Sequence, residues 1–223
     1  MLIPQRAERS SEVRIENIPT RLLVWHEQTD PHKLLHIRNA VEDDAPLPPI
    51  EAMAIGHRFL VLDGAHRAQA HHESHLPHIR ARLHTLPLTA EVPGWSHAIP
   101  LDAAIRLARL ALPAGNRGQA DIVINGVRRH LGTTSRRLRD QYLFSHKIAR
   151  IAYAHGITPL EPDSCVEHAH DSIVMTWQPP NLGDLWAMAN DMGPLPATVT
   201  RFAPLLAHGS VNTSTMTPVI PAA

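Results

Sequence analysis

Short apolar runs separated by turn residues dominate the first 88 positions of the chain. Alternating apolar and polar residues, and brief continuous apolar stretches, are typical of strands. Asp30-Pro31, followed by apolar residues at helical spacing, predicts a helix that the prolines from Pro46 onward would end. We therefore expect a compact mixture of strands and helices, with strands at 13–18, 22–25, 50–55, 58–62 and 79–83.

The pattern changes after a proline-rich segment at 87–93. Asn125-Gly126, between two apolar runs, is typical of a type I′ turn and predicts a hairpin. A long helix is expected to begin near Thr134 or Ser135 and to end at Gly156. We predict an α+β protein with two domains, 1–88 and 89–223. Further helices are expected at 101–112 and 184–190, and strands at 172–178 and 197–202.

The composition narrows the class of protein. With 223 residues, 43% of them hydrophobic and 19% charged, the chain can bury a substantial core. Its formal net charge of zero argues weakly against a dedicated DNA-binding protein, which usually has a basic excess. One cysteine permits neither an internal disulfide nor a cysteine-based zinc site. With no signal peptide or membrane-spanning stretch visible, we expect a cytoplasmic location.

One stretch combines several features of a phosphate-binding site. The apolar run 59–62 ends at Asp63-Gly64, and a helical pattern begins at Ala65. A helix N-terminus presents free backbone N–H groups and the positive end of the helix dipole, which together bind anions. His66 and Arg67 add side-chain donors. Asp63 beside a phosphate would make chemical sense as a ligand for a metal ion or as a partner for a substrate hydroxyl. A solvated Asp-Gly turn is the simpler alternative.

Two other segments carry groups that suit a reaction at such a site. Glu27 follows the apolar run through Trp25, so it would lie at the end of a strand, where a carboxylate can serve as a general base. Thr200 and Arg201 place a hydroxyl beside a guanidinium, a pair that suits a carboxylate or phosphate ligand. For both segments the alternative interpretation is that these residues are ordinary polar residues on the surface.

Histidines and arginines form the remaining candidate sites. Among 17 histidines, His71 and His75 are four apart and would share a helical face, and His168 and His170 are two apart. Metal binding is one interpretation of these pairs, and a solvated surface is the other. Cys165 has no neighbouring feature that would lower its pKa. A basic group could contact nucleic acid or simply face solvent: Arg128, Arg129, Arg136, Arg137 and Arg139.

The string Asp63-Gly64-Ala65-His66-Arg67 resembles the D-G-x-H-R signature of the ParB/sulfiredoxin superfamily, which holds nucleotide phosphates. Ala65 stands where sulfiredoxins have their reactive cysteine, so sulfiredoxin activity is not expected. The chain is similar to the ParB-like free serine kinases within this superfamily. Four further segments carry that similarity: His26-Glu27-x-x-Asp30-Pro31, Trp95-x-His97-x-x-Pro100, Trp177-Gln178-Pro179 and 195–202. Asp30 departs from the pattern, which has glutamate there.

This resemblance implies a ParB/sulfiredoxin-like N-terminal domain, an α+β C-terminal domain and an active site in the cleft between them. The implied reaction transfers a phosphoryl group from ATP or ADP to free L-serine, giving O-phospho-L-serine, with Mg²⁺ as cofactor. Glu27 would be the general base, and Asp63 would orient the hydroxyl or help to hold Mg²⁺. Phosphates would bind to Gly64, Ala65, His66 and Arg67, and the amino acid to Lys33, Trp95, His97, Thr200 and Arg201.

A nucleotide-binding regulator of the ParB type is the alternative. It would contact DNA through the basic group of five arginines. A partition protein of this kind would carry a G-E-R-R-type motif followed by a helix-turn-helix, and neither is recognisable in the sequence. Nucleic acid is therefore not an expected partner. A membrane is not expected either, because no stretch of the sequence approaches a membrane-spanning length.

Overall fold

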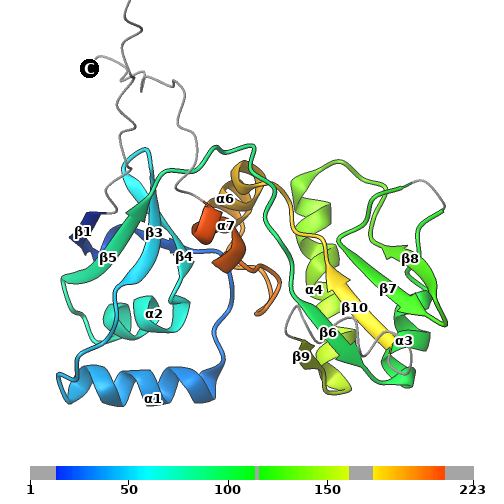
Figure 1. Cartoon of the computed structure of the whole chain (residues 1–223), viewed down its shortest axis with the longest axis horizontal. Helices are drawn as coiled ribbons and strands as arrows, with labels where there is room; N and C mark the ends of the chain where they lie inside the picture. Colours follow the sequence, from blue (N-terminus) through cyan, green and yellow to red (C-terminus); the bar gives the residue numbers. More distant parts are fainter. Residues whose placement is uncertain (1–13, 114–115, 161–172, 209–223) are drawn as a thin grey trace, which may run out of the picture.

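The computed structural model describes residues 14–113, 116–160 and 173–208. Two five-stranded sheets lie side by side, each with helices packed against it (Figure 1). The predicted α+β class is confirmed. Cys165, His168 and His170, as well as Ser172 at the start of an expected strand, lie outside the described residues.

The first sheet has the strand order β1-β5-β3-β4-β2. The β3–β4 hairpin is antiparallel, whereas β2 pairs with β4 and β5 pairs with β3 in parallel. Two helices and a 3₁₀ turn connect these strands. The elements are β1 (Arg14–Pro19), the 3₁₀ turn (Thr20–Leu22), β2 (Leu23–Trp25), α1 (Pro31–Glu42), β3 (Ile50–Ile55), β4 (Arg58–Asp63), α2 (Ala65–Glu73) and β5 (His78–His84).

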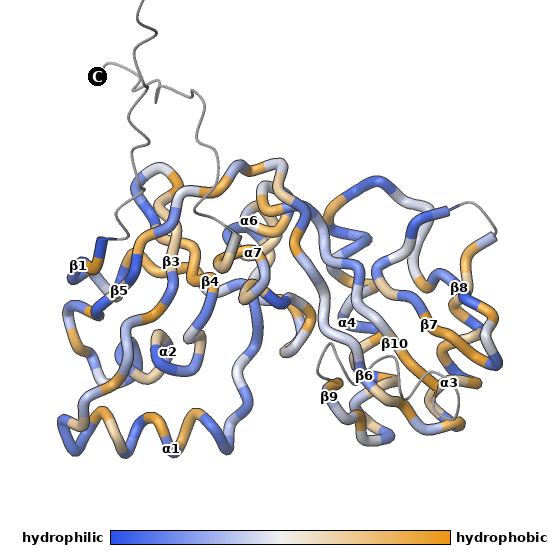
Figure 2. The backbone as a smooth tube through the Cα atoms, viewed as in Figure 1, coloured by the Kyte–Doolittle hydropathy of each residue, from blue (hydrophilic) through white to orange (hydrophobic). Residues whose placement is uncertain are grey.

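Local signals account for much of this unit. Asp30 caps α1 by accepting a hydrogen bond from the backbone N–H of His32 at 2.8 Å, and Pro31 occupies the first helical position, as predicted. No residue of α1 is fully buried, and Figure 2 shows polar and apolar residues alternating along it. This helix therefore lies on the outside, packed against α2.

The second sheet is antiparallel throughout, in the order β8-β7-β10-β6-β9. The predicted hairpin is confirmed, with Asn125 and Gly126 at φ values of 50° and 74°, the left-handed region that a type I′ turn requires. The elements are β6 (Ser96–Ile99), α3 (Leu101–Ala108), β7 (Ala120–Ile124), β8 (Val127–Leu131), α4 (Leu138–Ala154), β9 (Thr158–Leu160), β10 (Ile173–Trp177), α6 (Leu182–Asp191) and α7 (Ala203–His208).

The last described part of the chain returns to the first sheet. Helices α6 and α7 lie between the two sheets (Figure 1). Leu60 and Leu62 of β4 belong to the same buried cluster as Leu182 and Leu185 of α6. One apolar core therefore extends from the first sheet through α6 into the second. The predicted domain boundary after residue 88 falls in the segment that connects the sheets.

Three predictions about elements were wrong. Residues 197–202 form an irregular loop instead of a strand, because they wrap around a carboxylate contributed by the first sheet. Helix α4 begins at Leu138 because Ser135 accepts a hydrogen bond from the N–H of Arg137 before the helix starts. Helix α3 ends at Ala108, four residues early. Strands β6 and β9 and helix α7 were not predicted.

No helix in the described ranges has both the length and the apolar character needed to cross a membrane.

Candidate active site

Glu27 follows strand β2 directly, and the loop 195–202 encloses its carboxylate. The backbone of Leu195 pairs with the residues on either side of Glu27. Its carbonyl oxygen accepts a hydrogen bond from Gln28 N at 2.8 Å, and its N–H donates to His26 O at 2.7 Å. Further along the loop, Thr198 N donates to Glu27 Oε2 at 3.1 Å. Thr200 donates to Glu27 Oε1 through its backbone N–H and through its hydroxyl, the latter at 2.7 Å. The carboxylate is therefore fixed at both oxygens.

The loop reaches this geometry through an uncommon backbone conformation. Thr198 has a φ of 57°, a left-handed conformation that β-branched residues rarely adopt. It allows the N–H groups of Thr198, Val199 and Thr200 to converge on the carboxylate as a small anion-binding nest. Backbone strain of this kind persists only where the surroundings impose it, and it is common at functional sites.

Burial dominates the electrostatics of this region. It raises the pKa of Glu27 to about 7, against the opposing effect of the Thr200 hydroxyl and of the loop N–H groups. Burial also lowers the pKa of His26 to about 4, while the Val61 carbonyl and the charge of Asp63 oppose that shift. A carboxylate that titrates near neutral pH suits a general base.

The predicted phosphate turn has the expected backbone. Gly64 precedes α2 at a φ of 90°, a conformation that suits glycine, and a Cβ there would lie 2.7 Å from the Arg67 guanidinium and 2.8 Å from Ile50 Cγ2. Arg67 donates to the carbonyl oxygens of Pro48 and Pro49 at 2.8 and 2.9 Å, and to Asp63 Oδ2 at 3.2 Å. The Arg67 side chain therefore stabilises the turn by connecting it to the segment before β3.

His66 connects the turn to the start of α1. Its Nε2 accepts a hydrogen bond from Asp30 N at 2.9 Å, so Nε2 carries a lone pair and the neutral ring has its proton on Nδ1. Burial and the positive charge of Lys33 lower the pKa of His66, and the carboxylates of Asp30 and Asp63 oppose this. Exposed Lys33, on the first turn of α1, thus lies on the same side as the phosphate turn.

The segment 26–30 links the enclosed carboxylate with the phosphate turn. At one end, His26 Nδ1 donates to Val61 O at 2.7 Å, two residues before Asp63. At the other end, Asp30 contacts His66, and the Thr29 hydroxyl donates to Gln69 Oε1 of α2 at 2.6 Å. Glu27 lies between these contacts, so the base candidate and the phosphate turn belong to one continuous region.

The remaining candidate residues come from β6, from the residue before it and from the loop 195–202. His97 of β6 is fully buried, its Nε2 lies 3.1 Å from Thr198 Oγ1, and burial lowers its pKa to about 4. The Arg201 guanidinium lies over the ring of Trp95, 4.8 Å from the centroid. Side chains from both parts of the fold therefore meet at the loop 195–202, where His97 contacts the loop through the Thr198 hydroxyl.

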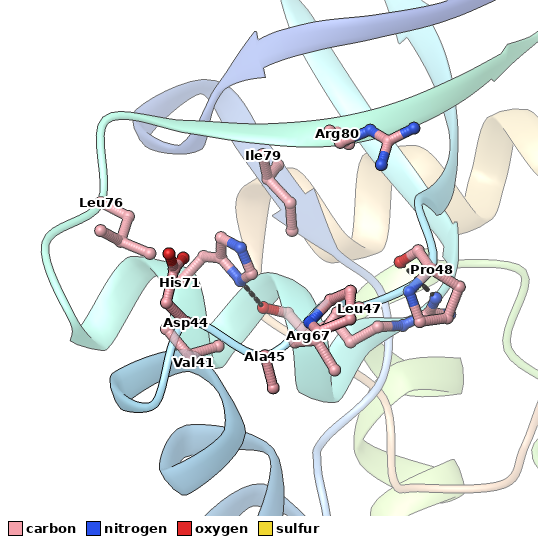
Figure 3. A pocket seen from close by; sticks show the side chains of 11 residues that line it. Val41, Asp44, Ala45, Leu47, Pro48, Arg67, His71, Leu76, Ile79 and Arg80 are labelled. Carbon is pink, nitrogen blue, oxygen red and sulfur yellow. Dashed lines mark hydrogen bonds between the residues drawn. The ribbon is translucent and has the colours of Figure 1, made fainter.

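A separate cavity of about 200 Å³ lies behind the turn (Figure 3). Arg67, His71 and Arg80 line it together with the end of α1 and the segment 44–48. It shares Arg67 with the phosphate turn but does not include Glu27, Asp63 or His66. The converging hydrogen bonds around Glu27, rather than this cavity, define the candidate active site.

The other candidate groups have ordinary surroundings. His71 Nδ1 lies 2.9 Å from the Arg67 carbonyl oxygen within α2, and His72 packs edge-on against Trp25. The described residues contain no cluster of three or more histidine, cysteine or acidic side chains arranged to hold a metal ion. The five arginines of the basic group are all exposed.

Sequence reasoning gave no role to three residues that shape the site. His26 was noted only as part of a motif, although a histidine that continues an apolar strand is a signal of burial. Thr198 was assigned to a strand. Tyr153 of α4, whose hydroxyl donates to the Ala197 carbonyl, gave no signal in the sequence, and burial raises its pKa to about 12.

Several solved structures share this fold over most of the chain. SbnI from Staphylococcus aureus, in a C-terminally truncated form, matches with a TM-score of 0.69 and 17% identity, over 87% of this chain and 84% of that one. A free serine kinase in complex with AMP matches with a TM-score of 0.63 and 13% identity, over 89% and 90%. A conserved hypothetical protein from Pyrococcus furiosus matches with a TM-score of 0.60 and 14% identity, over 86% and 91%.

No protein-family model and no curated protein sequence matches the chain. The resemblance inferred from short motifs is therefore confirmed by structure, at the level of the fold.

Proposed function

We propose that this protein is a kinase that transfers a phosphoryl group from ATP or ADP to the hydroxyl of free L-serine, giving O-phospho-L-serine. The observation that carries the proposal is the carboxylate of Glu27, which the loop 195–202 holds at both oxygens and which the segment 26–30 connects to a helix-start phosphate turn. Burial, which raises the pKa of Glu27 to about 7, supports a role as a base. Neighbours with the same fold include free serine kinase structures in complex with AMP and with ADP.

Glu27 serves as the general base in this reaction. The serine O–H bond breaks as its proton moves to the carboxylate, and the serine oxygen forms a bond to the terminal phosphorus of the nucleotide. The bond from that phosphorus to the bridging oxygen breaks, and the shortened nucleotide leaves. Phosphoryl transfer depends mainly on positioning and charge neutralisation, so a base held at both oxygens is well suited to it.

The turn at 63–67 holds the phosphates. The backbone N–H groups of Ala65, His66 and Arg67, in the first turn of α2, present donors and the positive helix dipole to an anion. Because Nε2 of His66 is an acceptor, its Nδ1–H provides an additional donor. The Arg67 side chain contributes by fixing the turn through Pro48, Pro49 and Asp63.

Asp63 fits a role in holding Mg²⁺. Its side chain is 66% exposed at the end of β4, and Mg²⁺ in such sites is commonly held by one or two carboxylates together with substrate phosphates. Mg²⁺ bound there would neutralise charge on the phosphate oxygens. On the amino-acid side, Arg201 above Trp95 and Lys33 beside His66 supply positive charge for the serine carboxylate and the transferred phosphate.

The substitution Glu27→Gln tests this function. It removes the base and keeps the side-chain size, so turnover should fall about 10²- to 10⁴-fold. Nucleotide affinity should change little, because the phosphate turn is intact. The assay incubates the protein with Mg²⁺, L-serine and either ATP or ADP and measures O-phosphoserine by mass spectrometry, with nucleotide binding measured by calorimetry.

Glu42→Gln is the matched control, since Glu42 is an exposed carboxylate at the end of α1. It should leave both turnover and binding unchanged. Normal turnover in Glu27→Gln would remove Glu27 from the mechanism. If the unaltered protein binds nucleotide but gives no product from serine with either donor, serine is not the acceptor.

A further inference from the structure

A line of hydrogen bonds runs from the first sheet to the proposed base. His26 Nδ1 lies 2.7 Å from the Val61 carbonyl oxygen, His26 Nε2 lies 2.6 Å from Thr200 Oγ1, and Thr200 Oγ1 lies 2.7 Å from Glu27 Oε1. His26 and Thr200 are 4% and 5% exposed. Solvent therefore has little access to the two inner members of the line.

Counting the hydrogens constrains how this line is protonated. A carbonyl only accepts, so Nδ1 of His26 must carry a hydrogen. The Thr200 hydroxyl has one hydrogen but two short contacts, to Nε2 of His26 and to Oε1 of Glu27. Both contacts are satisfied only if one additional proton is present, either on Nε2 or on Oε1. Without it, two lone pairs face each other across one contact, which is costly in a buried site.

We propose that His26, Thr200 and Glu27 form a buried relay that can take up one additional, shared proton, with His26 acting as a positioning residue that controls the protonation of Glu27 through Thr200. This inference rests on the proposed function, since it assigns to the relay the proton that the substrate gives up. It also explains why a polar ring lies in an apolar environment, where it packs in a T-shaped arrangement with Phe202, the two ring centroids 5.1 Å apart.

The relay favours the state that follows proton abstraction. Before the reaction, Glu27 is ionised, the imidazole of His26 is neutral, and one of the two contacts lacks a hydrogen. Once Glu27 has taken up the serine proton and carries it on Oε1 facing Thr200, the line is complete: Glu27 Oε1–H donates to Thr200 Oγ1, and Thr200 Oγ1–H donates to His26 Nε2. Both hydrogen bonds can form only after the serine O–H bond has broken, so they stabilise the protonated base that follows proton abstraction and oppose return of the proton to serine. The proton leaves to water from half-buried Glu27 after product release.

Other titratable groups near the relay are few among the described residues. Asp63 acts on His26 through its charge, and Tyr153 of α4 lies close enough to Glu27 to be affected by it. His97 reaches the same loop through Thr198. Since none of these groups lies within the line itself, changes at His26 and Thr200 should reach Glu27 along the line and not through these groups.

Two substitutions should move the titration of Glu27 in opposite directions. Thr200→Val removes a donor to the ionised carboxylate, so the acid limb of the kcat/KM profile should shift to higher pH by about one unit. His26→Leu removes the acceptor that competes for the Thr200 hydroxyl, so the hydroxyl can donate fully to Glu27 and the limb should shift to lower pH. Thr200→Ser should restore the original profile, and His57→Leu at the exposed β3–β4 turn should not move it.

The same test can be made without turnover. The ¹³C signal of the Glu27 carboxyl reports its pKa in the free protein, and the ring ¹⁵N signals of His26 should respond in the same pH range if the two share a proton. Opposite shifts of the Glu27 pKa in the two variants, or this joint titration in the unaltered protein, support the relay even if serine is not the acceptor. Shifts in the same direction, or a His26 ring that does not respond as Glu27 titrates, would overturn it.

Discussion

Two segments of the candidate site differ in what holds them in shape. The turn at 63–67 is held by contacts that span no more than 19 positions of the chain: Arg67 binds Asp63, four residues away, and the carbonyl oxygens of Pro48 and Pro49. The loop 195–202 is built from distant contacts, because its partners Glu27 and His97 lie in other parts of the fold. Thr198 and Glu27 are 171 positions apart in the chain.

The difference shows which parts of a site can be recognised in a sequence. A glycine at a strand end, with a helix start after it, specifies a turn by local sterics and local hydrogen bonding. A loop that folds around a carboxylate from another part of the chain takes its shape from that carboxylate, so its conformation cannot be predicted from its own residues. We expect substitutions in the two segments to have different effects on stability, nucleotide binding and pH dependence.

The largest effect is expected at Gly64. In Gly64→Ala the residue must keep a φ of 90°, and its Cβ would meet Arg67 and the fully buried Ile50. Strain and overpacking together should lower the free energy of unfolding by about 2–4 kcal/mol and weaken nucleotide binding. Denaturant unfolding and calorimetry with ADP measure the two effects.

Gly126→Ala is the matched control. Gly126 also has a positive φ, 74°, but a Cβ there would have nothing within 4 Å. In this variant the free energy of unfolding should fall only by the cost of backbone strain, about 1 kcal/mol, and nucleotide binding should be unchanged. If the two variants lose the same stability, crowding by Arg67 and Ile50 does not define the turn.

The sequence predicted the local parts of the fold well. Asp30-Pro31 marked the start of α1, Asn125-Gly126 marked the β7–β8 hairpin, and the strand pair on either side of Gly56 was placed within one residue. These features depend on capping, on fixed backbone angles and on turn chemistry, all of which act over a few residues. The backbone of the turn at 63–67 was predicted for the same reason.

What could not be predicted depends on tertiary contacts. Residues 197–202 carry β-branched and aromatic side chains, which favour a strand, but Thr198 adopts a left-handed conformation and the loop encloses Glu27. Arg67 was expected to direct its side chain to phosphate, and its bonds to Pro48 and Pro49 could be seen only in the folded chain. The link between His26 and Thr200 was likewise hidden, since 174 positions separate them.

The loop should also be more sensitive to pH than the turn. The pKa of His97 is about 4 in the folded protein, against an ordinary value of 6.5, so between these values only the unfolded chain takes up the proton. His97 therefore makes the folded state less stable as the pH falls through this window, by up to about 3 kcal/mol. His26 acts in the same direction, and Glu27, with a raised pKa, acts in the opposite one.

His97→Gln isolates this contribution. Stability measured by denaturant unfolding between pH 7 and pH 4 should decrease less steeply with falling pH in the variant than in the unaltered protein. His78→Gln, an exposed site on β5, should leave the slope as it is. Identical slopes for His97→Gln and the unaltered protein would mean that His97 is not the group that destabilises the loop in acid.

The smallest effect is expected at Thr198, where strain and hydrogen bonding oppose each other. Asparagine tolerates the left-handed region better than a β-branched residue, so Thr198→Asn should be neutral or gain up to about 1 kcal/mol of unfolding free energy. Thr198→Val keeps the strain and loses the hydroxyl contact with His97, so it should lose about 1 kcal/mol. Thr134→Asn, at an exposed position before α4, should change nothing measurable. A clear loss in Thr198→Asn together with none in Thr198→Val would mean that the shape of the loop depends on the β-branched side chain itself, and that its enclosure of Glu27 is not what imposes the left-handed conformation.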